Sequence, residues 1–177
     1  MRRNWFTALL LLGACAGTES PISNQETKIG LHKVYLVRHA EKQAGEDPSL
    51  TAAGEARAAE LADLLVDQGL TQIHSTNYKR TLETAAPLAA RTGLEVVLYD
   101  PRDLDRFAGE LRASVGVHLV VGHSNTTPQL ATALGGDPGG EIDEKAEYDR
   151  LYVIDLSSGA VVSSIERYGV RFQSSKD

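Results

Sequence analysis

The sequence has 177 residues, enough for one domain with a substantial core, and 42% hydrophobic and 24% charged residues are usual for a globular chain. Its formal net charge of −6 argues against a nucleic-acid partner, which is held mainly by neutralisation of phosphates. Its single cysteine excludes an internal disulfide framework and a zinc site built on several cysteines.

The N-terminus has the order of an export signal. Two arginines precede the apolar run of residues 5–12, and small residues follow, so residues 1–14 are predicted to be a signal peptide. Residues 12–15, Leu-Gly-Ala-Cys, resemble a bacterial lipoprotein box, in which Cys15 is acylated. The alternative is conventional cleavage after Ala16. Both readings predict an exported protein of the periplasm or cell envelope, and a lipid on Cys15 is the predicted membrane anchor.

The rest of the chain divides into a polar tether and one domain. Residues 15–31 are polar and lack periodicity, which is typical of a flexible linker. Residues 32–177 form the predicted domain, in which short apolar runs alternate with helical patterns. The predicted strands are residues 34–37, 73–75, 95–99, 117–121, 151–155 and 161–165. The predicted helices run from Thr51 toward Gly69, through residues 82–89 to Gly93, over 104–113, and from Thr126 or Thr127 to Gly135.

This alternation predicts an α/β fold. Strand and helix units in succession favour a three-layer α/β/α sandwich with a mostly parallel central sheet. The last two strands flank a turn at Ser158 and Gly159, which predicts a C-terminal hairpin.

Histidine and arginine follow the predicted strands. Arg38 and His39 come directly after the first strand, His123 follows the fourth, and Arg80 lies near the start of a helix. Ligands of such sheets bind at the carboxyl ends of the strands, where helix N-termini add N–H donors. A neutral imidazole can attack phosphorus, and arginine binds phosphate oxygens in pairs. These residues predict a phosphate site.

Four segments resemble, in order, those of the histidine phosphatase (phosphoglycerate mutase-like) superfamily. Residues 36–42, Leu-Val-Arg-His-Ala-Glu-Lys, resemble its Arg-His signature, and residues 50–54 its Leu-Thr-x-x-Gly helix start. Residues 75–85 resemble the segment with the second phosphate arginine, and residues 120–125 the segment with the second histidine.

The resemblance implies a role for each residue. His39 is expected to be the nucleophile that becomes phosphohistidine, and Arg38 and Arg80 to bind the phosphoryl oxygens. His123 is expected to complete the pocket and stabilise the transition state. The family uses no metal, so no cofactor is expected.

The resemblance leaves the proton donor open. Some members have an aspartate directly after the second histidine, where this chain has Ser124. Other members have an acid after the third strand, where Asp103 and Asp105 are candidates, and Glu41 or an acid of the stretch 137–149 could substitute.

The expected function is metal-independent hydrolysis of a phosphomonoester, on a phosphorylated small molecule or envelope component. The alternatives are a non-catalytic module that binds a phosphorylated ligand and a phosphohistidine-protein phosphatase. Substrate choice is expected to depend on loops 43–49 and 135–147.

Other phosphatase and hydrolase classes do not fit. The stretch 122–126 nearly matches the nucleophile elbow of serine hydrolases, but no histidine follows His123 to complete a triad. The lone cysteine lies in the signal, and no P-loop pattern is present.

The other histidines and the acidic stretch near the C-terminus are not assigned to the phosphate site. His74 and His118 lie within strand runs and are interpreted as structural, and His32 as a surface residue. The acidic stretch 137–149 is interpreted as a solvated connection, with a substrate lid as the alternative.

Overall fold

The computed structural model describes residues 30–173. The predicted signal peptide, Cys15 and most of the predicted tether lie outside them, as do residues 174–177. The strands are β1 (Lys33–Arg38), β2 (Gln72–Ser75), β3 (Val96–Leu98), β4 (Val117–Gly122), β5 (Arg150–Asp155) and β6 (Val162–Arg167). The helices are α1 (Ala52–Leu65), α2 (Lys79–Thr92), α3 (Leu104–Ala113) and α4 (Thr126–Ala133).

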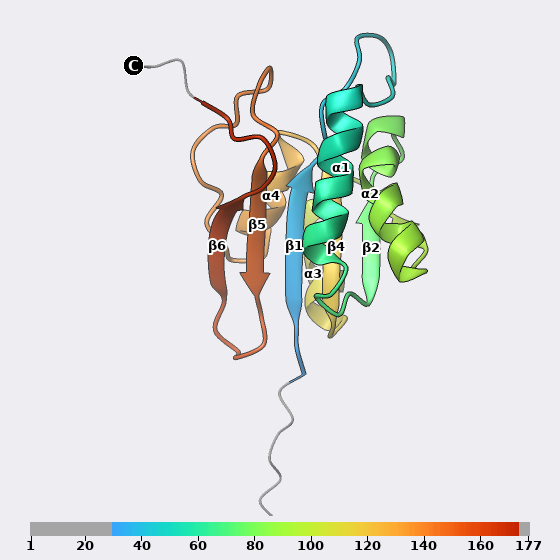
Figure 1. The fold of residues 1–177 in the computed structure, drawn as a ribbon. Coiled ribbons are helices and arrows are strands. Elements are labelled where there is room, and N and C mark those ends of the chain that lie inside the picture. The colour runs from blue at the N-terminus through green and yellow to red at the C-terminus, as the bar shows by residue number, and fades with distance from the viewer. Residues whose placement is uncertain (1–29, 174–177) are drawn as a thin grey trace, which may run out of the picture.

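The six strands form one sheet in the order β3-β2-β4-β1-β5-β6 (Figure 1). The first four strands of the chain pair in parallel, whereas β5 is antiparallel to β1 and to β6. The mostly parallel sheet and the C-terminal hairpin are therefore confirmed. Because β5 runs opposite to β1, the start of β5 lies beside the end of β1, where Val37 pairs with Leu151.

Helices cover both faces of the sheet. On one face α1 and α2 pack on a core that includes Tyr35 and Val37 of β1. On the other face α3 and α4 pack on a core that includes Val34 and Leu36. Successive side chains of a strand point to opposite faces, so a strand covered on both faces must be apolar throughout. The predicted three-layer α/β/α sandwich is confirmed.

The helix ends follow the local signals in the sequence. The Thr51 side chain accepts a hydrogen bond from the Gly54 N–H at 3.1 Å and caps α1. Gly93 ends α2 with a φ of 72°, a left-handed conformation that favours glycine. Strand β3 is shorter than predicted, because it lies at the edge of the sheet and pairs only with the short strand β2. None of the helices in residues 30–173 is long and apolar enough to cross a membrane.

Three histidines line up at the amino-terminal half of the sheet. The His74 and His118 rings stack with centroids 5.5 Å apart, and both side chains are buried, as predicted. The interpretation of His32 as a surface residue was wrong. Its ring is 7% exposed, and its Nε2 is 3.0 Å from the Leu111 carbonyl oxygen, because the residues before β1 lie against α3.

Candidate active site

The two motif histidines meet at the carboxyl edge of the sheet. Strands β1 and β4 are parallel neighbours with Arg38 paired to Gly122, so His39 and His123 leave the sheet side by side. The His39 N–H donates to the Gly122 carbonyl at 2.9 Å. The ring centroids are 5.6 Å apart in an edge-to-face arrangement. The sheet register therefore brings together residues that are 84 positions apart in the sequence.

His39 is held as a neutral imidazole with one nitrogen available. Its side chain is 3% exposed, and its Nδ1 is 2.8 Å from the Ala40 carbonyl oxygen. A carbonyl only accepts, so Nδ1 carries the hydrogen and Nε2 keeps its lone pair. Burial, together with the nearby charges of Arg38 and Arg80, lowers the pKa of His39 to about 3. At neutral pH the ring is an unprotonated imidazole of fixed orientation, with a lone pair on Nε2.

His123 is fixed by a chain of hydroxyl groups. Its Nε2 is 2.9 Å from Thr76 Oγ1, which lies 3.0 Å from Thr81 Oγ1. The Thr81 hydroxyl donates to the carbonyls of Thr76 and Tyr78, which precede α2. The Thr76 hydroxyl therefore donates to Thr81 and accepts from Nε2–H of His123. The other ring nitrogen, Nδ1, lies 3.4 Å from Nη2 of Arg80. Burial, and then the charges of Arg80 and Arg38, lower the pKa of His123 to about 4.

Arg38 is gripped by the segment between α4 and β5. Its Nη1 donates to the carbonyls of Glu147 at 2.8 Å and Asp143 at 3.2 Å, and its Nη2 donates to that of Glu144 at 2.6 Å. The Tyr148 ring lies against the guanidinium. Arg38 is only 5% exposed, so these carbonyls are the acceptors that compensate its burial.

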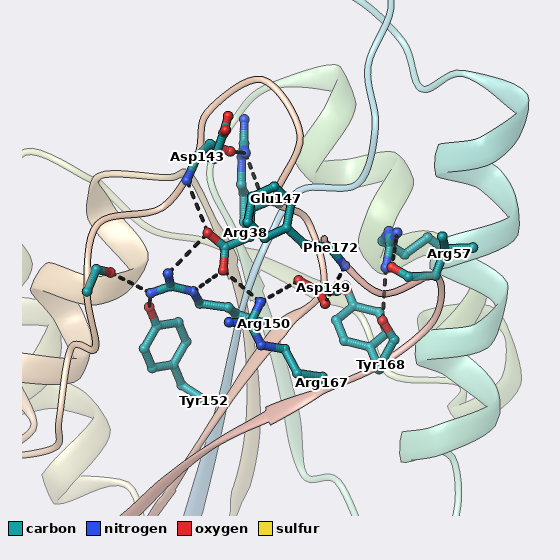
Figure 2. A network of polar contacts seen from close by, with 12 residues as sticks. Arg38, Arg57, Asp143, Glu147, Asp149, Arg150, Tyr152, Arg167, Tyr168 and Phe172 are labelled. Atoms are coloured by element: carbon teal, nitrogen blue, oxygen red, sulfur yellow. Dashed lines mark hydrogen bonds and ion pairs between the residues drawn. The ribbon is translucent and has the colours of Figure 1, made fainter. Parts of the chain in front are cut away.

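The segment that grips Arg38 is anchored by buried ion pairs (Figure 2). The Glu147 carboxylate accepts hydrogen bonds from Arg150 at 2.5 Å, from Arg167 at 2.6 Å and from the Asp143 N–H at 3.1 Å. Burial alone raises the pKa of Glu147, but these hydrogen bonds outweigh it and lower that pKa. Asp149, also buried, accepts from Arg167 at 2.6 Å.

The interpretation of this acidic stretch as a solvated connection was therefore wrong for Glu147 and Asp149. Each carboxylate is paired with an arginine of β5 or β6, which allows burial of both charges. Glu141, Asp143 and Glu144 are exposed, as a solvated connection predicts.

Two guanidinium groups retain a buried donor. Within residues 30–173, the Nε atoms of Arg38 and Arg80 are buried and have no hydrogen-bond partner. An unpaired buried donor costs about 1 to 3 kcal/mol, and an anion would satisfy it. Two cationic guanidiniums beside two neutral imidazoles form a pocket suited to a phosphate group. We call these four residues, Arg38, His39, Arg80 and His123, the phosphate cradle.

The structure places the three predicted proton donors in other contacts. Glu41 forms a bidentate ion pair with Arg57 of α1, with a shortest distance of 2.8 Å. Asp103 caps α3, where it accepts from the Arg106 N–H at 3.4 Å. Asp105 lies in the first turn of α3. None of the three has a hydrogen bond or ion pair with the phosphate cradle within the described residues.

Two other carboxylates lie beside the cradle. The sequence analysis did not single out Asp47, whereas Glu144 belongs to the acidic stretch 137–149 that it kept as a possible source of the proton. Asp47 accepts from the Lys79 N–H at 2.9 Å and lies 3.8 Å from Nη1 of Arg80. Glu144 accepts from the Ser124 hydroxyl at 2.6 Å, next to His123. Both belong to the loops expected to control substrate choice. No signal in the sequence singles out either residue, because the loop conformation decides which acid lies next to the cradle.

No group of three or more His, Cys, Asp or Glu side chains within residues 30–173 is arranged to hold a metal ion.

Residues 34–111 match the family model of the histidine phosphatase superfamily (branch 1). A relative from Yersinia enterocolitica, named probable phosphoglycerate mutase GpmB, is 33% identical over 120 residues. The match covers 63% of this chain and 54% of that relative. The chain thus spans about half the length of the curated relatives it matches.

Two solved structures share the fold. The mycobacterial glucosyl-3-phosphoglycerate phosphatase has a TM-score of 0.59 at 15% identity, with 78% of this chain and 98% of that chain covered. The protein histidine phosphatase SixA complexed with tungstate has a TM-score of 0.61 at 17% identity, with 77% and 95% covered.

Proposed function

We propose that this chain is a histidine phosphatase that hydrolyses phosphomonoesters through a phosphohistidine on His39, and the match of residues 34–111 to the superfamily model supports this. The observation that carries the proposal is the phosphate cradle, in which a neutral imidazole with a free Nε2 lies among two arginines and a second histidine. Relatives named as mutases and phosphatases support phosphoryl transfer in general.

In the first step, the Nε2 lone pair of His39 attacks phosphorus. A P–N bond forms, the P–O bond to the organic group breaks, and the departing oxygen keeps the electron pair and takes up a proton. The hydrogen on Nδ1, donated to Ala40, stays in place and shares the developing positive charge with that carbonyl. The guanidinium groups of Arg38 and Arg80 stabilise the charge on the equatorial oxygens.

In the second step, water attacks the phosphohistidine. A new P–O bond forms, the P–N bond breaks, and its electron pair returns to Nε2 of His39 while the water gives up a proton. His123 is proposed to stabilise both transition states, because a phosphate dianion beside Nδ1 raises the proton affinity of its ring and makes it a second donor. The proton donor stays a prediction for Asp105, Asp103 and Glu41.

The proposed setting is the cell envelope. An acylated Cys15 would anchor the domain to a membrane and restrict it to exported or scavenged phosphate esters. Labelling of the cells with a radioactive fatty acid tests this proposal. We expect label on the wild-type protein and none on Cys15→Ala. An unlabelled wild-type protein would favour conventional cleavage after Ala16.

The decisive experiment is hydrolysis of p-nitrophenyl phosphate by the purified full-length chain in detergent, with His39→Ala as the control. We expect turnover by the wild type only, and 32P retained on the wild-type protein after an alkaline denaturing quench, because a phosphoramidate bond survives alkali. Tight binding of inorganic phosphate without turnover would instead favour the non-catalytic binding module. Turnover of a phosphohistidine peptide alone would favour the protein phosphatase.

A further inference from the structure

A cavity adjoins the phosphate cradle on the side of α4. Its volume is about 510 Å³, and it lies between the start of α4 and the segment from Gly139 to Glu144. Its polar side chains are those of Ser124, Asn125, Gln129, Glu141 and Glu144.

Ser124 and Glu144, which line the cavity, also connect it to the cradle. Ser124 directly follows His123, and its hydroxyl donates to the Glu144 carboxylate at 2.6 Å. The carbonyl of the same Glu144 accepts from Nη2 of Arg38 at 2.6 Å. One residue therefore lines the cavity with its side chain and holds a phosphate-binding arginine with its backbone.

The proposed reaction gives this neighbouring space a use. In an in-line displacement, the departing oxygen lies on the far side of phosphorus from His39. The organic group of the ester must therefore extend past the cradle residues that surround the phosphate. Two residues of the cavity lining are next to the cradle, because the Glu144 carbonyl accepts from Arg38 and Ser124 follows His123, and the cavity offers room for a small organic group.

The charged side chains that line the cavity are all negative. Its ionisable side chains are two carboxylates, Glu141 and Glu144, and the amides of Asn125 and Gln129 add neutral hydrogen-bonding groups. No lysine or arginine lines it. A positively charged group gains from this field, whereas a carboxylate on the substrate is repelled by it.

We propose that this cavity is the leaving-group subsite and that it selects phosphomonoesters whose organic group carries an ammonium. The inference rests on the proposed phosphatase function and specifies its substrate class as phosphorylated amino alcohols or amino sugars. It also separates this chain from a relative named for phosphoglycerate, because the organic group of phosphoglycerate carries a carboxylate that Glu141 and Glu144 repel.

The test compares three small esters on the purified full-length chain: phosphoethanolamine, glycerol 3-phosphate and 3-phosphoglycerate. We expect kcat/KM to fall in that order, with about a tenfold difference between the first and the last at low salt. The difference should shrink as ionic strength rises, because salt screens charges at an open site.

Variants of Glu141 assign the preference to the cavity. Glu141 is suited to the test because it makes no side-chain contact with the cradle within the described residues, whereas Glu144 also holds Arg38. Glu141→Gln should reduce the preference for phosphoethanolamine, and Glu141→Lys should move it toward 3-phosphoglycerate. Glu95→Gln, an exposed acid elsewhere on the domain, is the matched control and should keep the wild-type order.

The outcomes separate this inference from the proposed function. If p-nitrophenyl phosphate is hydrolysed with His39 required, but the three esters react equally or Glu141→Lys leaves their order unchanged, the leaving-group subsite is wrong and the phosphatase stands. If p-nitrophenyl phosphate is not hydrolysed at all, the proposed phosphatase function is wrong, and the leaving-group subsite that rests on it is wrong as well.

Discussion

The Arg38 guanidinium lies over the Tyr148 ring, with 4.1 Å between Cζ and the ring centroid. The centroid of the same ring lies 6.1 Å from that of His39, so Tyr148 is a neighbour of both the arginine and the histidine. The two Nη atoms of Arg38 donate to three backbone carbonyls, and a cation–π contact with Tyr148 adds to these hydrogen bonds. Arg38 is thus oriented by the chain before any phosphate binds.

This orientation predicts that lysine cannot replace Arg38. Arg38→Lys keeps the charge but loses the planar fork that meets the three carbonyls and the phosphate together. We expect kcat/KM for p-nitrophenyl phosphate to fall about 100-fold or more. Arg112→Lys, a change at an exposed arginine of α3, is the control. Activity of Arg38→Lys within a few-fold of the wild type would contradict the role assigned to the fork.

Glu147 is predicted to support both folding and phosphate binding. Glu147→Gln removes the charge that pairs with Arg150 and Arg167, and we expect a loss of about 3 kcal/mol in the free energy of unfolding. We also expect weaker inhibition by inorganic phosphate, because the carbonyls that orient Arg38 lose their anchor. Urea unfolding and phosphate inhibition measure the two effects. Reduced stability with unchanged phosphate affinity would show that the network does not position Arg38.

The buried histidines predict acid sensitivity. Burial lowers the pKa of His74 to about 4, as in His123, and that of His39 to about 3, all from an ordinary value of 6.5. As the pH falls from 6.5 to 4, the unfolded chain binds protons that the folded protein does not. The free energy of unfolding must therefore decrease, by up to about 1.4 kcal/mol per pH unit for each histidine.

Urea unfolding in phosphate-free buffer at several pH values across this window measures the slope. His74→Gln removes one titrating ring outside the phosphate cradle. The slope of the free energy of unfolding against pH should therefore be smaller in this variant, by the contribution of one histidine. A stability that stays constant down to pH 4 would show that these rings are not buried as neutral groups.

Glu41 is predicted to matter for stability. Glu41→Gln breaks the bidentate pair with Arg57, a half-buried contact whose loss should cost about 2 kcal/mol. If Glu41 is also the proton donor, hydrolysis of an alkyl phosphate will fall much further than that of p-nitrophenyl phosphate, whose leaving group needs less protonation. Asp103→Asn and Asp105→Asn tested with the same two esters complete the comparison.

Chelation is expected to leave activity intact. The proposed chemistry uses an imidazole nucleophile and two guanidinium groups, so EDTA should not reduce turnover of p-nitrophenyl phosphate. The measurement compares dialysed protein with and without EDTA, and then with added Mg²⁺ or Zn²⁺. Inhibition by EDTA that either cation reverses would overturn the metal-independent mechanism.

Much of the fold follows from local signals in the sequence. Thr51 and Gly93 mark helix ends, and the unbroken apolar run of β1 indicates a strand buried on both faces. The cradle also follows, because His39 and His123 each stand directly after a strand and parallel strands end at one edge.

The remaining features depend on contacts between distant segments. His32 is buried because the chain before β1 lies against α3, a contact that its neighbours in sequence do not indicate. Glu147 and Glu144 are close in a uniformly acidic stretch, yet one is buried in ion pairs and the other is exposed beside Ser124. Only the positions of Arg150 and Arg167 in the folded hairpin distinguish them.

The antiparallel pairing of β5 with β1 has a consequence for how such a domain can diversify. Because β5 starts where β1 ends, the segment that leads into it must cross the edge of the sheet that carries His39, whatever its length or sequence. Insertions or exchanges between Gly135 and Ile142 would reshape the space beside the phosphate, and the strand pairs of the sheet would be unaffected. Under the proposed function, the same scaffold can therefore acquire new substrates through changes in one surface segment, while the four cradle residues stay in place.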